Sequence, residues 1–291
     1  MRVLKRSALA LPLLGGLAAA ALAATPVTAQ AQAGAQAGSS AGTSSASVRV
    51  VTGGFLQLDY VGSADANNVL IMLESGTDAV RINDSVSIVP GPGCVQAPGD
   101  ATTVRCSVGI SRIGARLGTG ADTFTSLVPL IGTVEGDAGD DLFRPSRSEG
   151  NLNSRIMYVG GAGVDTATYQ GVPATGPTGS TGVRVALDGQ ANDGRDATAS
   201  RPADQDNVQT ENLIGSSAAD NLTGDRFANR LTGGNGRDSL SGGLGDDVLD
   251  LRDQAADQLS FCGDGIGDTA FADRAALDPV SVDCETVERA N

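Results

Sequence analysis

Aspartate recurs at one place in a nine-residue pattern between Gly215 and Asp250. The segment divides into four units: GSSAADNLT, GDRFANRLT, GGNGRDSLS and GGLGDDVLD. The sixth position of the successive units holds Asp220, Asn229, Asp238 and Asp247. Oxygen atoms of carboxylates and carbonyls are the ligands that calcium prefers, and the ion takes about 6–8 of them. The spacing therefore predicts cation binding.

A nine-residue unit can divide into a tight turn of about six residues and a strand of about three. The eighth position points inward in such a unit, and here it is always leucine: Leu222, Leu231, Leu240 and Leu249. Two units make one coil with strands on opposite faces, so residues two units apart lie on the same edge. We therefore expect Asp220 to stack over Asp238, and Asn229 over Asp247.

Stacked carboxylates repel one another, and a divalent cation between them reverses the interaction. We predict a calcium ion between Asp220 and Asp238. A weaker site is predicted at Asn229 and Asp247, because asparagine supplies a carbonyl oxygen without a charge. Magnesium is disfavoured, since it demands a tight octahedron and keeps its waters. Backbone carbonyls of the glycine turns would complete the coordination, and the turn glycines are Gly233, Gly236, Gly242 and Gly245.

Imperfect copies of the same pattern occur earlier in the chain, at residues 118–124, 136–144 and 160–168. They place Asp122, Asp141 and Asp165 at the sixth position. These aspartates are irregularly spaced, which indicates inserted loops, and we predict them as further metal ligands.

The run GGNGRDSLSGGLGDDVLD resembles the hemolysin-type calcium-binding repeat (RTX) of secreted bacterial proteins. The resemblance covers residues 215–250, is partial over 118–168 and does not reach 48–112. It implies a right-handed parallel β-roll with calcium in its turns. Two features depart from the family: the first two units lack the full glycine set, and the export signal here is N-terminal rather than C-terminal. Family members usually attach the repeat to a separate effector.

Charge and composition exclude several classes of function. The chain has 291 residues, of which 34 are acidic and 20 basic, and it has no histidine. Without Arg2, Lys5 and Arg6 of the predicted signal, the net charge is −17. This charge argues against nucleic acid and anionic membranes as partners and favours cations. The lack of histidine, and of lysine after Lys5, excludes Ser-His-Asp and Cys-His nucleophiles, His-ligated zinc and lysine Schiff bases.

The organisation of the chain follows from composition. Residues 1–29 are typical of a secretory signal peptide, with a membrane anchor as the alternative, and no other stretch could span a membrane. Residues 30–47 are predicted to be a flexible leader of Ala, Gly, Gln and Ser. A β region at 48–113 follows, with predicted strands at 48–51, 55–61, 68–73, 79–82 and 85–90. An irregular β-solenoid at 114–214 includes a polar loop around one strand, Val183–Leu187, and the tandem repeats occupy 215–250. A cap is predicted at 251–291.

Four cysteines follow the signal, and an even number in an exported chain favours disulfides. Four cysteines allow three pairings. We favour the local pairs Cys94–Cys106 and Cys262–Cys284, with free thiols or long-range pairing as the alternative.

These observations predict an all-β fold: a right-handed parallel β-roll or β-solenoid with irregular N-terminal coils and a disulfide-capped C-terminal end. The predicted function is that of a secreted, non-catalytic calcium-binding protein that calcium folds after export. Its expected place is extracellular or at the cell surface, with a cell-surface or matrix partner. The alternative is a parallel β-helix enzyme, such as a calcium-dependent polysaccharide lyase. An adhesin is a further reading, compatible with the first.

Overall fold

The structure, a computed structural model, describes residues 42–145, 154–175, 181–198 and 202–290. All of these residues belong to one compact unit, Gly38–Asn291. The predicted signal peptide and residues 30–41 of the predicted leader lie outside the described residues. Every regular element of the described part is a β-strand, and none of it forms a helix that could cross a membrane.

The strands lie in three sheets. In spatial order, sheet 1 contains β16 (Asn207–Gln209), β12 (Arg155–Ala162), β10 (Ile131–Ala138), β8 (Ile110–Thr119), β2 (Leu56–Val61), β1 (Thr43–Val50) and β5 (Ser87–Pro90). Sheet 2 contains β24 (Thr286–Arg289), β23 (Thr269–Ala272), β21 (Val248–Asp250), β19 (Arg230–Thr232), β17 (Asn212–Ile214), β13 (Thr166–Thr168), β11 (Leu142–Arg144), β9 (Thr123–Ser126), β3 (Asn68–Leu73), β4 (Ala79–Asn83), β7 (Asp100–Val108) and β6 (Cys94–Ala97). Sheet 3 contains β15 (Gly194–Arg195), β14 (Thr181–Ala186), β18 (Ala219–Thr223), β20 (Ser239–Leu244) and β22 (Phe261–Asp264).

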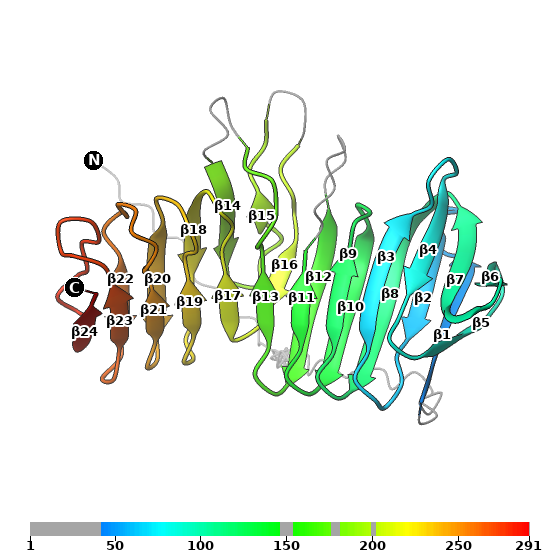
Figure 1. The fold of residues 1–291 in the computed structure, drawn as a ribbon, viewed down its shortest axis with the longest axis horizontal. Coiled ribbons are helices and arrows are strands. Elements are labelled where there is room, and N and C mark those ends of the chain that lie inside the picture. Colours follow the sequence, from blue (N-terminus) through cyan, green and yellow to red (C-terminus); the bar gives the residue numbers. More distant parts are fainter. Residues whose placement is uncertain (1–41, 146–153, 176–180, 199–201, 291) are drawn as a thin grey trace, which may run out of the picture. The chain divides into compact units, whose positions relative to one another are not determined.

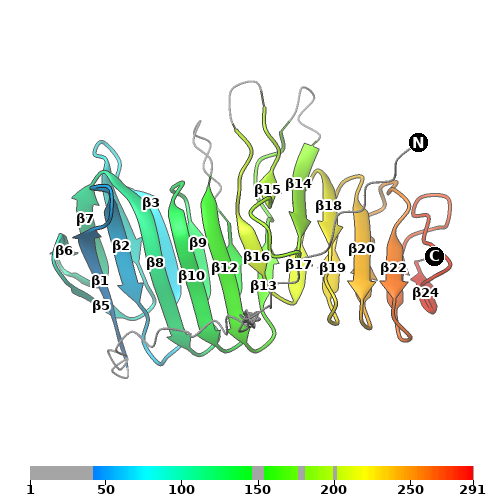
Figure 2. The ribbon, with the colours of Figure 1, turned by 180° about the vertical axis from the view of Figure 1, so that it is seen from behind.

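The chain passes repeatedly from one sheet to the next through short glycine-rich turns. From β8 to β13 it alternates between sheets 1 and 2, and from β18 to β23 between sheets 3 and 2 (Figure 1). Successive strands of one sheet pair in parallel along these stretches, as the reverse view also shows (Figure 2). Strands that pair in parallel end at the same edge of their sheet. The turns that follow these strands therefore stack on one another.

The leucine columns predicted from the nine-residue period are confirmed. Leu222 pairs with Leu240 and Leu231 with Leu249, in each case 18 residues apart. All four side chains are fully buried, and Leu213, one period upstream, is buried against Leu231 in the same column. Burying a leucine side chain contributes about 1.5–3 kcal/mol, so the columns supply the main apolar core of this segment. The column in sheet 2 continues towards the N-terminus through Phe124, Phe143 and Ala167.

The N-terminal part has mixed sheets. β2 and β3 pair in parallel with β8 and β9, so they begin the same stacks that the later strands continue. By contrast, β1 pairs antiparallel with β2, and β4, β6 and β7 form an antiparallel extension of sheet 2. The five strands predicted between residues 48 and 90 all occur, as β1 to β5.

One expectation about the irregular segments is wrong. The predicted leader extends to Ser47, but β1 already begins at Thr43, because Ala46 is small enough to be fully buried there and Ser44 Oγ donates to Asp84 Oδ2 at 2.7 Å. The strand predicted at Val183–Leu187 occurs as β14, and the polar stretch around it contains buried carboxylates. Asp193 and Asp206 are buried, and their carboxylates accept backbone N–H bonds from Ala186 and Ile156 at 2.8 and 2.7 Å. Carboxylates here replace the acceptors that a neighbouring strand would supply.

Both predicted disulfides are present. Cys94–Cys106 joins the adjacent antiparallel strands β6 and β7. Cys262–Cys284 joins β22 to the segment before β24, across a sequence separation of 22 residues. In the chain-entropy account, closing loops of this size stabilises the fold by about 3 kcal/mol each. The second disulfide fixes the last segment of the chain against the end of the stacks.

Candidate metal sites

The predicted pairs of ligands stand next to each other. The backbone N–H of Asp220 donates to Asp238 Oδ1 at 2.9 Å, and that of Asn229 donates to Asp247 Oδ1 at 2.8 Å. All four side chains are buried, with at most 4% of their surface exposed. The predicted stacking at 18-residue intervals is therefore confirmed as a contact. Whether each residue binds a metal ion remains a prediction.

The aspartates of the imperfect copies belong to the same structure. Asp122 N–H donates to Asp141 Oδ1, and Asp141 N–H donates to Asp165 Oδ1, both at 2.8 Å. We call this line of acidic and amide side chains before the strands of sheet 2 the carboxylate column. Its members, in order, are Asn67, Asp122, Asp141, Asp165, Glu211, Asn229, Asp247, Asp268 and Glu285. Along most of it, one side chain accepts the backbone N–H of the preceding member.

A second, shorter column lies before the strands of sheet 3. Val183 N–H donates to Asp220, Asp220 N–H to Asp238, and Asp238 N–H to Asp257 at 2.8 Å. Sequence reasoning did not assign Asn67, Glu211, Asp257, Asp268 or Glu285 to a site. For Asp257 the available signal was distance, because Asp257 follows Asp238 by 19 residues. Asp268 follows Asp247 by 21 residues and lies in the glycine-aspartate run CGDGIGDTA at residues 262–270, which was a second signal.

The two oxygens of these carboxylates have different surroundings. Oδ1 accepts the N–H bond, whereas Oδ2 of Asp122, Asp141, Asp165 and Asp247 is buried without a hydrogen-bond partner. A buried oxygen with no donor costs about 1–3 kcal/mol, and more when it is charged. A proton or a cation on Oδ2 removes that cost. Asp220 differs, because its Oδ2 also accepts the N–H of Ser216 at 2.6 Å.

Glycine at the first position of a unit makes room for converging oxygens. A Cβ on Gly233 would lie 2.5 Å from Asp238 Oδ2. A Cβ on Gly242 would overlap both Asp247 Oδ2 and the carbonyl oxygen of Cys262. A carboxylate and a backbone carbonyl of the next turn therefore approach the same glycine, and both are acceptors.

The predicted turn glycines at the fourth position have a different role. Gly236 and Gly245 both have positive φ angles, of 148° and 106°. A Cβ on Gly236 would also lie 2.6 Å from the carbonyl oxygen of Ala218 in the preceding turn. Side chains at these positions would separate the stacked turns.

The donor chemistry fits calcium. Among the described residues, no group of three or more His, Cys, Asp or Glu side chains could hold a metal ion, so any site must combine at most two carboxylates with backbone carbonyls. Calcium accepts such mixed oxygen sets. Zinc prefers nitrogen and sulfur, whereas the chain has no histidine and its cysteines form disulfides.

Burial changes the acidity of these groups. Desolvation raises the pKa of Asp220 and Asp247 from 3.8 to about 6, and that of Asp238 to about 7. The same cause raises the pKa of Asp122, Asp141 and Asp165 to about 6. Backbone N–H donors act in the opposite direction and are the weaker effect. Near neutral pH, both a proton and a cation can therefore satisfy these carboxylates.

Asn229 is an amide that lies between acidic members of the column. Its Oδ1 accepts the N–H of Asp225 at 2.8 Å, and its Nδ2 donates to the carbonyl oxygen of Glu211 at 3.1 Å. The amide thus provides the donor that a carboxylate lacks, and it meets a backbone carbonyl directly. This contact supports the expectation that a site at Asn229 is weaker.

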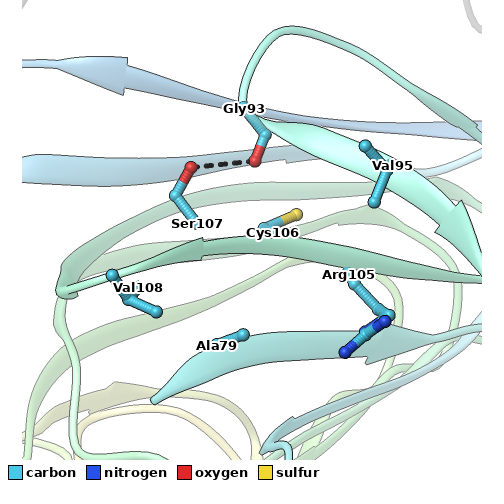
Figure 3. Close-up of a pocket in the computed structure, with 7 residues that line it drawn as sticks. All are labelled: Ala79, Gly93, Val95, Arg105, Cys106, Ser107 and Val108. Atoms are coloured by element: carbon cyan, nitrogen blue, oxygen red, sulfur yellow. Dashed lines mark hydrogen bonds between the residues drawn. The ribbon is translucent and has the colours of Figure 1, made fainter. Parts of the chain in front are cut away.

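A shallow pocket on the antiparallel part of sheet 2 lies apart from the columns in sequence and in composition (Figure 3). Its exposed apolar residues are Val95 and Val108. Ser107 Oγ donates to the carbonyl oxygen of Gly93 at 3.0 Å, and Arg105 forms an ion pair with Glu74. Both polar side chains are engaged, so the pocket offers an apolar surface and no carboxylate.

Comparison with known proteins agrees with the geometry of the tandem units. Residues 214–249 match the family model of the RTX calcium-binding nonapeptide repeat, in four copies. A search of curated proteins gave no match. The matched segment contains the stacked pairs Asp220–Asp238 and Asn229–Asp247. Residues 214–249 are therefore RTX calcium-binding nonapeptide repeats, and their cofactor is Ca²⁺.

Proposed function

We propose that this chain is an exported, non-catalytic β-roll that calcium folds outside the cell, where it serves as a structural or adhesive component of the cell surface or matrix. The observation that carries the proposal is the carboxylate column, whose Oδ2 atoms are buried without donors. The alternation of the chain between stacked parallel strands of two sheets supports a β-roll. The N-terminal signal predicted at residues 1–29 supports export.

The residues that would hold calcium are the paired aspartates and the carbonyls that converge beside the first-position glycines. We assign this role to Asp220 with Asp238 and to Asp247, and to Asp122, Asp141 and Asp165 in the imperfect copies. Bound calcium supplies positive charge to carboxylate and carbonyl oxygens that otherwise face one another. The protein's own contribution is to orient each carboxylate, since the N–H bond to Oδ1 fixes where Oδ2 points.

Calcium binding would be coupled to folding. The oxygens of one site come from turns about 18 residues apart, and the unfolded chain does not hold such turns together. Binding free energy therefore becomes folding free energy. Extracellular modules bind calcium with a Kd of about 10⁻⁴–10⁻³ M, so the chain would stay unfolded where calcium is scarce and fold after export.

The test is a calorimetric calcium titration of the chelator-treated mature chain, with circular dichroism measured in parallel. We expect saturable uptake with a gain of β signal, and a smaller uptake for Asp238→Ala. Asp264→Ala is the matched control, because Asp264 is exposed and lies outside both columns. Absence of heat and an unchanged spectrum up to several millimolar calcium, the upper part of the range for extracellular modules, would reject the proposal.

A further inference from the structure

The stacks continue beyond the matched repeats. The family match ends at residue 249, and the nine-residue register is lost after Asp250. Nevertheless Gly243 pairs with Gly263, and Leu249 pairs with Ala270, so the turn between β22 and β23 lies directly on the turn between β20 and β21. The cap therefore supplies one more turn of the stack, although its sequence no longer follows the repeat.

Asp268 occupies the place of a repeat aspartate in this added turn. Its Oδ1 accepts the N–H of Asp247 at 2.7 Å, as Asp247 Oδ1 does for Asn229. Its own N–H donates to Glu285 Oε2 at 2.9 Å, where the column ends. Asp247 and Asp268 are both completely buried, and Oδ2 of each has no hydrogen-bond partner. Two buried carboxylates, each with one oxygen that has no hydrogen-bond partner, thus follow each other at the junction.

A backbone carbonyl of the cap lies beside Asp247 in the same way that a carbonyl of the next repeat lies beside Asp220. A Cβ on Gly242 would overlap Asp247 Oδ2 and the carbonyl oxygen of Cys262. Within the repeats, a Cβ on Gly215 would likewise overlap Asp220 Oδ2 and the carbonyl oxygen of Gly233. Cys262 therefore stands where the first glycine of a further repeat would stand. At Asn229 the side-chain amide donates to the carbonyl oxygen of Glu211. Asp247 has no such amide to donate to the carbonyl oxygen of Cys262.

We infer that the last repeat and the disulfide-bonded cap share a divalent cation site, with Asp247, Asp268 and the carbonyl oxygen of Cys262 as ligands and calcium as the ion. The inference rests on the proposed function, since it uses the same ion. It extends calcium binding beyond the matched repeats to a segment with a different sequence. It also couples calcium to the Cys262–Cys284 disulfide, because one ligand is the carbonyl of a bridged cysteine, and Glu285, next to Cys284, holds Asp268.

The experiment counts bound calcium in the mature chain by equilibrium dialysis, using calcium alone as the probe. Asp268→Asn keeps an oxygen that can accept the Asp247 N–H but removes the charge. Asp264→Asn is the matched control, since it removes the same charge from an exposed side chain in the same turn. We expect one calcium ion fewer, or at least tenfold weaker binding at one site, for Asp268→Asn, and no change for Asp264→Asn.

A second readout follows the disulfide in the wild-type chain and does not depend on a variant. Cys262 is completely buried and Cys284 is only 8% exposed, so opening of the cap exposes both sulfurs to a small thiol. We expect calcium to slow reduction of Cys262–Cys284 at least tenfold in the wild type and in Asp264→Asn, and far less in Asp268→Asn. Equal rates with and without calcium in the wild type would overturn the inference.

The outcomes separate the two proposals. If Asp238→Ala loses a calcium ion while Asp268→Asn retains the wild-type number and affinity, the cap site is wrong and the repeat sites stand. If the wild-type chain binds no calcium, the proposed function fails, and the cap site fails with it.

Discussion

Replacing Asp247 by asparagine or by alanine separates the two tasks of a column carboxylate. Oδ1 accepts the N–H of the buried Asn229 at 2.8 Å, and Oδ2 is buried without a donor. Asparagine keeps the acceptor and places an N–H₂ group near the Cys262 carbonyl, as Asn229 does at Glu211. Alanine leaves the Asn229 N–H without an acceptor, which costs about 1–3 kcal/mol.

In chelator at pH 8, we therefore expect Asp247→Asn to be at least as stable as the wild type, and more stable than Asp247→Ala by about 1–3 kcal/mol. Calcium at 100 times Kd stabilises the wild type by about 2.7 kcal/mol for each site. Both variants should lose that increment at Asp247. For a domain of this size, about 1 kcal/mol corresponds to 2–4 °C in Tm.

The assay is urea unfolding followed by far-ultraviolet circular dichroism, with and without calcium. Equal stabilities of the asparagine and alanine variants in chelator would refute the hydrogen-bond role of Oδ1. An undiminished calcium increment in Asp247→Asn would refute the ligand role of the carboxylate. The hydrogen-bond role of Oδ1 and the ligand role of the carboxylate are therefore tested independently.

Three further predictions concern the core, the turns and pH. Leu240→Ala should lower the free energy of unfolding by about 2–5 kcal/mol, whereas Leu244→Ala, at a half-exposed position, should change it by no more than about 0.5 kcal/mol in urea unfolding. Gly233→Ala should weaken calcium binding in calorimetry and cost about 1–3 kcal/mol, because its Cβ would lie 2.5 Å from Asp238 Oδ2. Burial raises the pKa of Asp238 to about 7 and of Asp247 to about 6, so the folded state binds more protons than the unfolded state. This contribution to stability is complete below pH 3.8 and is lost as pH rises through the folded pKa values of about 6 and about 7. Tm in chelator should therefore fall between pH 3.8 and 7, and saturating calcium should remove the fall.

The regular part of the fold was predictable because one physical constraint repeats. A strand of about three residues buries one side chain, so leucine at a fixed position specifies both the strand and its inner face. This logic gave the Leu222–Leu240 and Leu231–Leu249 contacts and the stacking of Asp220 on Asp238. The two disulfides followed from the short separations of their cysteines.

The irregular parts were less predictable because different residues can satisfy the same contact. Glu211 and Glu285 accept column N–H groups with a longer side chain, so the aspartate pattern does not reveal them. Asp268 lies in the glycine-aspartate run CGDGIGDTA but is displaced by inserted residues, so the register of β21 with β23 was needed to place it after Asp247. The antiparallel pairing of β4 with β7 has no counterpart in the repeat, since an alternating apolar pattern does not specify strand direction.

Calcium binding in the stacked turns is tested most directly by anomalous X-ray scattering from crystals of the mature chain grown with calcium chloride. We expect calcium peaks between the turns that carry Asp220 and Asp238, and beside Asp247 Oδ2, with a backbone carbonyl in each coordination shell. Well-ordered turns with no calcium peak, and with Oδ2 of Asp247 within hydrogen-bonding distance of the Cys262 carbonyl, would show that a proton satisfies the column. That result would contradict calcium binding in these turns.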